Sequence, residues 1–448
     1  MSAAEFSTHT SALWDALCDY LFSQLQAGED CNISLDAEDT LFLRLNNNRV
    51  RQNTDVTQRV LQLRYQSAGR TVDQGVSLSG QVDADCRRID TLLERCRLDA
   101  AVLPTDPFQV PMQNYGSSRE VFGGQLLAPE ALIAAIVEPA LGSDMAGLYA
   151  GGTVICANRN SKGQNHWFET ENFFLDYSLY SGPQAAKSVY AASTWNPDDW
   201  AANLARSRTS LDLLKRPLQQ VQPGAYRSYF APAAFADLMG MLSWGALSSA
   251  AWKQGRSPFK KLIEKELRLS PLLSVAENFG LGLTPRFNDL GEVAPQSLDL
   301  IEAGNLRNLL VSSRSAKEYG LQANGASGFE MPRALDVAAG SLAEQDVLQA
   351  LGRGLYLSNL HYLNWSDPVA ARVTGMTRYA CFWVEGGEIV GPINNLRWDE
   401  SLFSALGPQL MALGHLAEVS PEVGTYSKRT PGGSRTPGAL IDAFHFTL

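Results

Sequence analysis

Five histidines are the residues best suited to hold a catalytic metal ion, and they stand singly along the chain: His9, His166, His361, His415 and His445. A zinc peptidase needs two imidazoles one helical turn apart, a third protein ligand and an open position for water. Here no HExxH pattern occurs, and neighbouring histidines are never closer than 30 residues. We therefore expect no metal ligand in this chain, although the spacing leaves open a site assembled from distant loops.

Nucleophilic catalysis has little support in the sequence. A cysteine nucleophile needs a nearby base, and the one combination in a single expected sheet region is Cys381 with His361. Cys381 stands beside Phe382 and Trp383 in an apolar run, so we interpret it as a packed core thiol. Neither a GxSxG elbow nor a GxGxxG or GxxxxGK[ST] loop occurs. We expect no catalytic residue in this chain.

The remaining cysteines suggest neither a metal cluster nor a disulfide scaffold. The six are far apart and form no CxxC pair: Cys18, Cys31, Cys86, Cys96, Cys156 and Cys381. Cys86 and Cys96 share a helical stripe with Ile89 and Leu93, so we expect them in a core.

Composition indicates an ordinary globular protein with more than one domain. The chain has 448 residues, of which 45% are hydrophobic and 19% charged. Its net charge is −10 and it has no long basic cluster, so we expect no nucleic-acid partner. The first residues lack a signal peptide and no stretch of about 18 apolar residues occurs. We expect a cytoplasmic protein without a membrane segment.

The first half of the chain mixes helices with strands. Leucines at helical spacing predict a helix over 11–25, and alternation over 39–52 around Asn46–Asn48 predicts a hairpin. Further elements expected in this half are strands over 56–66 and 70–79, helices over 83–101 and 129–137, and strands over 147–157 and onward to residue 180. Asn196 followed by Pro197 predicts the start of a helix to about residue 214.

The second half is expected to be richer in strands. Residues 225–230 predict a strand, and Pro232 predicts the start of a helix to about residue 251. From 280 to 440, Gly and Pro at short intervals favour a twisted or barrel-like sheet. The fold class is thus α+β, with an N-terminal α/β meander domain over 1–216 and a β-rich, barrel-like C-terminal domain over 217–448.

Several segments occur in an order that resembles the TldD/PmbA family of peptidase subunits. These segments are Phe42–Val50, Asn160–Gly163, Phe287–Glu292, Leu300–Gly304, Ser312–Ala316, Asn324–Gly325, Thr374–Arg378 and Phe382–Pro392. The last resembles the family's closing W-x-E-x-G-E-I-x-x-P pattern. The Thr374–Arg378 segment departs from the better-known bacterial PmbA sequences.

The catalytic half of this family carries an HExxxH helix, and the matching piece here is Leu238–Leu247. The two ligand positions fall on Gly240 and Gly245, and the general-base position falls on Met241. The resemblance therefore implies that this chain lacks the zinc ligands and the base. Two glycines in a helix each cost about 0.5–1 kcal/mol relative to alanine, so we expect close packing of another backbone there, within the chain or at a subunit interface.

The resemblance implies a TldE/PmbA-like, non-catalytic subunit of a heterodimeric zinc peptidase that degrades or matures unfolded peptides. The zinc is then expected in a TldD-type partner, with activity appearing only in its presence. Asn324, Thr377 and Arg378 are candidate peptide-binding residues, although Arg378 also fits an ordinary surface charge or ion pair. Two alternatives are a stand-alone, homodimeric peptide or protein binder and an independent hydrolase that uses Cys381 or a serine.

Overall fold

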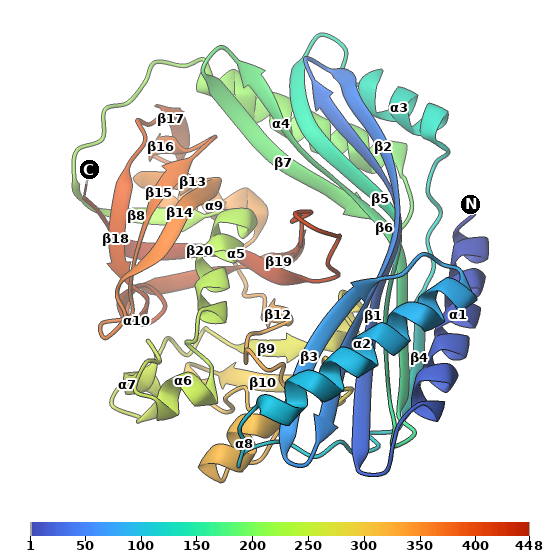
Figure 1. Cartoon of the computed structure of the whole chain (residues 1–448). Coiled ribbons are helices and arrows are strands. Elements are labelled where there is room, and N and C mark those ends of the chain that lie inside the picture. The colour runs from blue at the N-terminus through green and yellow to red at the C-terminus, as the bar shows by residue number, and fades with distance from the viewer. Residues whose placement is uncertain (1, 448) are drawn as a thin grey trace.

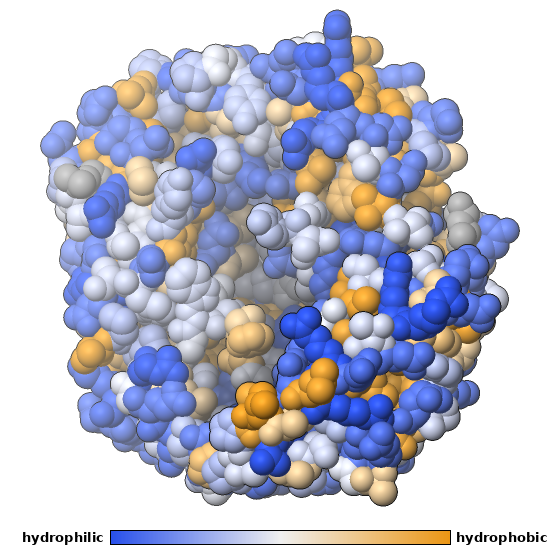
Figure 2. Space-filling model, viewed as in Figure 1, coloured by the Kyte–Doolittle hydropathy of each residue, from blue (hydrophilic) through white to orange (hydrophobic). Residues whose placement is uncertain are grey.

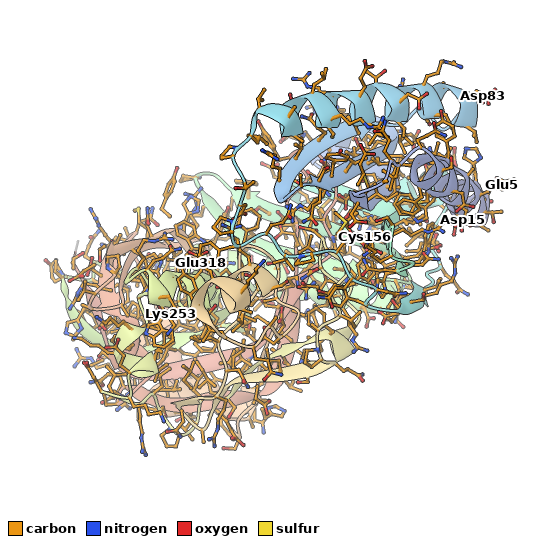
Figure 3. The ribbon with its side chains drawn as sticks, turned by 60° about the horizontal axis from the view of Figure 1, so that its bottom comes forward. Glu5, Asp15, Asp83, Cys156, Lys253 and Glu318 are labelled. Atoms are coloured by element: carbon orange, nitrogen blue, oxygen red, sulfur yellow. The ribbon has the colours of Figure 1, made fainter. Side chains whose placement is uncertain are left out.

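The strands of the protein form two sheets in a computed structural model that describes residues 2–447. The first sheet is made by residues 29–192 and the second by residues 224–446. Figure 1 shows the two sheets in separate lobes, and Figure 3 shows the same lobes from another side, with two long helices outside the first sheet. The boundary expected after residue 216 falls in the connection between the sheets.

The first sheet has seven strands in the order β3-β2-β1-β5-β6-β4, with β7 also paired to β6. Its strands are β1 (Glu29–Asn46), β2 (Arg49–Ser67), β3 (Arg70–Ser77), β4 (Ser117–Phe122), β5 (Asp144–Asn160), β6 (Asn165–Ser181) and β7 (Gln184–Ala192). The pairs are antiparallel except that β4 runs parallel to β6.

The expected hairpin at Asn46–Asn48 is confirmed. Asn47 and Asn48 have φ of 50° and 52°, the left-handed conformation that a two-residue hairpin turn requires. The separate strand expected over 56–66 is wrong, because β2 runs unbroken from Arg49 to Ser67. Polar residues break the alternation of polar and apolar side chains around Asn53–Asp55, where both faces of β2 are largely exposed. The strand continues there because the backbone pairing with β1 does not need apolar side chains.

Four helices cover the first sheet: α1 (Ala3–Ser23), α2 (Val82–Val102), α3 (Pro129–Val137) and α4 (Pro197–Leu214). α1 and α2 share one core with β1, β2 and β5, while α3 and α4 share a second core with β5 and β6. α1 begins well before residue 11, because Ser2 and Glu5 form a capping box. The start of α4 is as expected, since Asn196 accepts from the N–H groups of Asp198 and Asp199.

The second sheet has thirteen strands, with the main order β11-β10-β9-β12-β20-β8-β13-β16-β17. Its strands are β8 (Gly224–Phe230), β9 (Val275–Asn278), β10 (Ser297–Glu302), β11 (Asn305–Leu306), β12 (Ala334–Val337), β13 (Gly354–Leu357), β14 (Asn359–Asp367), β15 (Arg372–Arg378), β16 (Phe382–Glu385), β17 (Glu388–Pro392), β18 (Arg397–Ser401), β19 (Leu410–Pro421) and β20 (Gly433–Phe446). A branch runs from β20 through β18 and β15 to β14. The α+β class is confirmed, but across residues 2–447 the sheet order stays open, so the expected barrel-like closure is wrong.

The helices of the second half are short. They are α5 (Pro232–Gly240), α6 (Ser249–Lys253), α7 (Lys260–Ile263), α8 (Ser313–Tyr319), α9 (Val347–Leu351) and α10 (Leu402–Ala405), with 3-10 turns at Met241–Ser243, Phe279–Leu281 and Glu344–Asp346. A continuous helix to residue 251 is wrong, because the α-helix ends at Gly240 and Gly245 has φ of 83°. Phe235, Leu238 and Met239 bury the inner face of α5 in the main core.

The two lobes meet at several places and leave a hollow between them. Ala186 on β7 and Leu214 at the end of α4 share one core cluster with Ala380 and Phe382. Elsewhere, the loop between β19 and β20 reaches the first sheet, where Arg429 donates to the carbonyl of Gly152. Figure 2 shows that this face of the molecule is hollowed near its centre. None of the helices described over residues 2–447 is both long and apolar enough to cross a membrane.

Candidate functional site

The expected zinc-helix positions do not share one helical face. Gly240 ends α5, lies exposed, and has open space where a Cβ would be. Met241 is buried in the core, and Gly245 lies beyond the 3-10 turn in a left-handed conformation. Close packing within the chain is therefore wrong for Gly240, since the nearest neighbours of its missing Cβ lie beyond 4 Å, and packing at a subunit interface stays a prediction.

A zinc site does not fit the residues that the structure describes. Over residues 2–447, no group of three or more His, Cys, Asp or Glu side chains is arranged to hold a metal ion. His166 is buried, shares a hydrogen bond of 2.9 Å with Ser118 and stacks on Phe287. His445 lies 2.6 Å from the buried carboxylate of Glu400. These two imidazoles are thus engaged by neighbours that serve the fold.

Two of the three candidate peptide-binding residues are engaged inside the protein. The amide of Asn324 donates to the carbonyl of Leu309 at 2.7 Å and accepts from the N–H of Val311 at 3.0 Å. Thr377 is 2% exposed, and its hydroxyl oxygen accepts from the N–H of Leu396. Only Arg378 is exposed, with its guanidinium over the ring of Tyr379.

Asp237 on α5 is a site residue that sequence reasoning missed. Its Oδ2 accepts a hydrogen bond of 3.1 Å from the backbone N–H of Leu360 on β14. The carboxylate is reached by solvent, yet the surrounding protein desolvates it and raises its pKa to about 6, against the opposing effects of the Leu360 hydrogen bond and Lys187. It is the one charged residue of an otherwise apolar helix. A single charge in an apolar helix is the sequence feature that could have indicated a site residue here.

His361 and Arg378 lie on the paired strands β14 and β15, of which β14 contacts α5. Opposite pairs in the register are Asn359 with Arg378 and His361 with Met376, so these four side chains share one face of the strand pair. Partial burial lowers the pKa of His361, and the positive charge of Arg378 lowers it further. We call Asp237, Asn359, His361, Tyr362 and Arg378 the α5 face.

Two aromatic residues of the β14–β15 pair have left-handed backbone conformations, one of them at the α5 face and one next to it. Tyr362 has φ of 54° at a bulge of β14, its side chain is 75% exposed, and its ring centroid lies 4.1 Å from that of His361. Tyr379, at the end of β15, has φ of 64°. Left-handed conformations are rare for aromatic residues and cluster at binding sites. The imidazole of His361 lies beside the exposed phenol of Tyr362 and within the electrostatic influence of Arg378, so these three groups can offer polar contacts to a ligand.

Cys381 is a core thiol, as the sequence indicates. It is buried, and its thiol donates to the carbonyl of Arg378 at 3.2 Å. Burial raises the pKa of Cys381, which disfavours the thiolate that a nucleophile needs.

Solved structures define the class of fold. TldE from Thermococcus kodakarensis superposes with a TM-score of 0.80 at 14% identity, covering 97% of this chain and all of that one. A Thermotoga maritima protein described as a candidate modulator of DNA gyrase superposes with a TM-score of 0.78 at 17% identity and covers the same shares. At these identities the likeness shows the fold.

The sequence comparisons identify the family. Residues 223–448 match the family described as the PmbA/TldA metallopeptidase C-terminal domain. The metalloprotease PmbA of Escherichia coli O157:H7 is 28% identical over 218 residues, which make up 44% of this chain and 46% of PmbA. The match thus spans less than half the length of that curated relative. The chain belongs to the PmbA/TldD family.

Proposed function

We propose that this chain is a TldE/PmbA-like, non-catalytic subunit of a heterodimeric zinc peptidase that degrades or matures unfolded peptides. The observation that carries the proposal is the end of α5, where Gly240, Met241 and Gly245 offer neither a metal ligand nor a general base. Over residues 2–447, no other group of three or more His, Cys, Asp or Glu side chains could hold the zinc ion instead. The zinc then belongs to a TldD-type partner, and the pair works in the cytoplasm.

The α5 face and the hollow between the lobes are the proposed wall of a peptide channel. Among the described strands, β14 pairs only with β15, so its other edge is open to an added strand. At Leu360 the backbone N–H on this edge is already used, because it donates to the carboxylate of Asp237. An extended peptide presents backbone donors and acceptors on both sides, which suits the bulged, exposed part of β14 from Tyr362 onward.

Reconstitution with a partner tests this role. The chain and a TldD-type subunit from the same organism are purified separately, and hydrolysis of an unfolded peptide is followed for each alone and for the mixture. We expect hydrolysis only in the mixture, together with a heterodimer on size exclusion. Hydrolysis by the isolated chain overturns the proposal. A stable homodimer that binds peptide and ignores the partner favours a stand-alone binder instead.

A further inference from the structure

Residues 253–268 form a basic segment on the surface of an acidic chain. The segment runs from the end of α6 through α7, and its six cations and two glutamates give it a net charge of +4, whereas the whole chain carries −10. Figure 1 shows α6 and α7 together at an outer corner of the second lobe. All six cationic residues are exposed: Lys253, Arg256, Lys260, Lys261, Lys265 and Arg268. We call residues 253–268 the basic segment.

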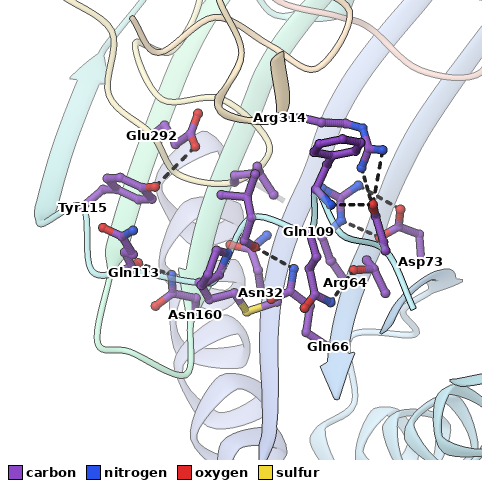
Figure 4. Close-up of a pocket in the computed structure, with 17 residues that line it drawn as sticks. Asn32, Arg64, Gln66, Asp73, Gln109, Gln113, Tyr115, Asn160, Glu292 and Arg314 are labelled. Carbon is purple, nitrogen blue, oxygen red and sulfur yellow. Dashed lines mark hydrogen bonds and ion pairs between the residues drawn. The ribbon is translucent and has the colours of Figure 1, made fainter. Parts of the chain in front are cut away.

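Most cations of the basic segment have no carboxylate beside them. In the cavity that Figure 4 shows between the lobes, by contrast, Arg64 holds Asp73 with two hydrogen bonds, of 2.7 and 2.8 Å. Among the described residues, only Lys260 of the basic segment forms an ion pair, with Glu264 at 4.0 Å. The positive charge of this surface is therefore available to a ligand that brings its own anionic groups.

The turn that carries Trp244 is packed against the basic segment. Trp244 follows α5 and is 54% exposed. Two residues later, the carbonyl of Ala246 accepts a hydrogen bond of 2.9 Å from the hydroxyl of Ser257, which lies within the basic segment. A Cβ on Gly245 would lie 3.5 Å from the Cβ of Ala251 on α6. These contacts hold the turn of Trp244 next to the basic segment.

A second exposed aromatic residue is fastened to the start of α6. Phe329 is 82% exposed, and the residue after it, Glu330, has φ of 52°. The buried carboxylate of Glu330 accepts from the hydroxyls of Ser248 and Ser249 and from the backbone N–H of Ala250. Because a buried carboxylate depends on such donors, these bonds fix the turn that presents Phe329. An exposed aromatic ring on a fixed turn is suited to anchor a binding partner.

We propose that the basic segment, together with Trp244 and Phe329, is a docking site for an acidic polypeptide segment. Carboxylates of the polypeptide pair with the lysines and arginines, and its apolar side chains cover the two aromatic rings. Neither contact involves zinc or a second subunit, so this site goes beyond the proposed peptidase role.

The surroundings favour a polypeptide over a nucleic acid. Glu264 and Glu266 lie inside the basic segment, where they repel phosphates but can accept from the backbone N–H groups of a polypeptide. The rest of the chain carries a net charge of −14, the difference between −10 and +4, and a nucleic acid that extends beyond the basic segment meets this charge. A short acidic stretch between neutral residues stays on the basic segment.

Binding of labelled peptides to the full chain tests the site. A short, fluorescein-labelled peptide of glutamate and leucine is titrated with the protein and followed by fluorescence anisotropy at low and at physiological salt. The same peptide with glutamine in place of glutamate is the neutral control, and an oligothymidylate of equal length tests nucleic acid. We expect the acidic peptide to bind about tenfold more tightly than the neutral one at low salt, with an affinity that falls as salt is added.

Three results of this titration overturn the proposal. They are failure of the acidic peptide to bind in the millimolar range, equal binding of the neutral peptide, and tighter binding of the oligothymidylate. Because the isolated chain suffices, such a result is distinct from a failure to hydrolyse peptides with a partner subunit.

Variants of exposed residues locate the binding. Lys260→Gln combined with Lys261→Gln removes two charges of the basic segment, and Phe329→Ala removes one of the two rings. We expect each variant to weaken binding of the acidic peptide about three- to tenfold. Unchanged affinity in either variant contradicts the assignment.

Matched controls remove the same kinds of group elsewhere. Arg49→Gln combined with Arg51→Gln removes two exposed charges from β2, and Tyr426→Ala removes an exposed ring from the loop between β19 and β20. Both controls should bind the acidic peptide as the unaltered chain does. A loss in a control as large as in its test variant would show that the peptide does not bind at the basic segment.

Discussion

The carboxylate of Asp237 accepts a hydrogen bond from the backbone N–H of Leu360, and this contact joins the helix α5 to the unpaired edge of β14. A charged residue in an apolar helix is costly unless it serves the fold or a site. Asp237 accepts from a backbone group that an added peptide strand would otherwise meet. The relationship ties the helix that ends at the first vacant zinc position, Gly240, to the proposed peptide channel.

Replacing Asp237 with Asn should stabilise the fold at neutral pH. The folded pKa of Asp237 is about 6 and its ordinary value is 3.8, so the folded state binds the proton more tightly and stability falls as pH rises through this interval. Because the side chain is solvent-accessible, we expect a gain of no more than about 1 kcal/mol at pH 7. Urea unfolding at pH 7 and below pH 3.8 measures it. A gain of equal size at both pH values would contradict desolvation of the carboxylate as the cause.

Replacing Arg378 with Gln should raise the pKa of His361. Partial burial would still hold the pKa down, but the repulsion between two positive charges would be gone. Proton NMR titration of the His361 ring resonances follows the change. Arg372→Gln is the matched control, since Arg372 begins the same strand and pairs with Asp399. An unchanged pKa in Arg378→Gln would show that the two side chains do not interact.

Replacing Glu330 with Gln should destabilise the segment that follows α5. The buried carboxylate accepts from the hydroxyls of Ser248, Ser249 and Ser312 and from the N–H groups of Ala250 and Ser312. Burial alone would raise its pKa, but these bonds reverse the effect and lower it. We expect a loss of about 2–3 kcal/mol at pH 7.

Unfolding measurements at low pH check the prediction for Glu330→Gln. Since the folded pKa of Glu330 is lowered, its contribution is present above the ordinary carboxylate range and is lost as pH falls. The difference in unfolding free energy between the unaltered chain and Glu330→Gln should therefore shrink in acid. Glu302→Gln, on an exposed pair, should change stability by less than about 0.5 kcal/mol at either pH.

Replacing Arg429 with Ala should free the loop between β19 and β20 from the first sheet. The buried guanidinium bonds the carbonyl of Gly152 and the side chain of Asn172, and the backbone N–H of Arg429 donates to Glu38 at 3.3 Å. Burial lowers the pKa of Arg429 to about 10, yet it remains charged at pH 7. Limited proteolysis should cut residues 422–432 faster in this variant. Lys428→Ala, which removes a more exposed pair with Asp36, should have a smaller effect.

Turns and helix starts were predicted correctly from the sequence where the contacts that determine them lie within a few residues. Asn47 and Asn48 tolerate the left-handed turn, and Asn196 with Pro197 starts α4, because in both cases the deciding contacts lie within a few residues. The end of α5 was predicted too late. Its apolar residues continue at helical spacing past Gly240, and the left-handed Gly245 that breaks the pattern is compatible with a helix in sequence alone.

The sites depend on contacts that no local pattern encodes. Asp237 meets Leu360 across 123 residues, and Glu330 meets Ser248 across 82. Asn324 and Thr377 stand in family segments, yet their polar groups are used to hold loops together. The sequence therefore could not separate an exposed polar side chain such as that of Arg378 from one that fastens a turn.

The content of zinc in the isolated chain tests the central claim most directly. The chain is purified alone, incubated with zinc, freed of unbound metal and analysed by inductively coupled plasma mass spectrometry. The account predicts no stoichiometric zinc in this chain, and one zinc per heterodimer once a TldD-type partner is added. One tightly bound zinc per isolated chain, accompanied by peptidase activity, would contradict it.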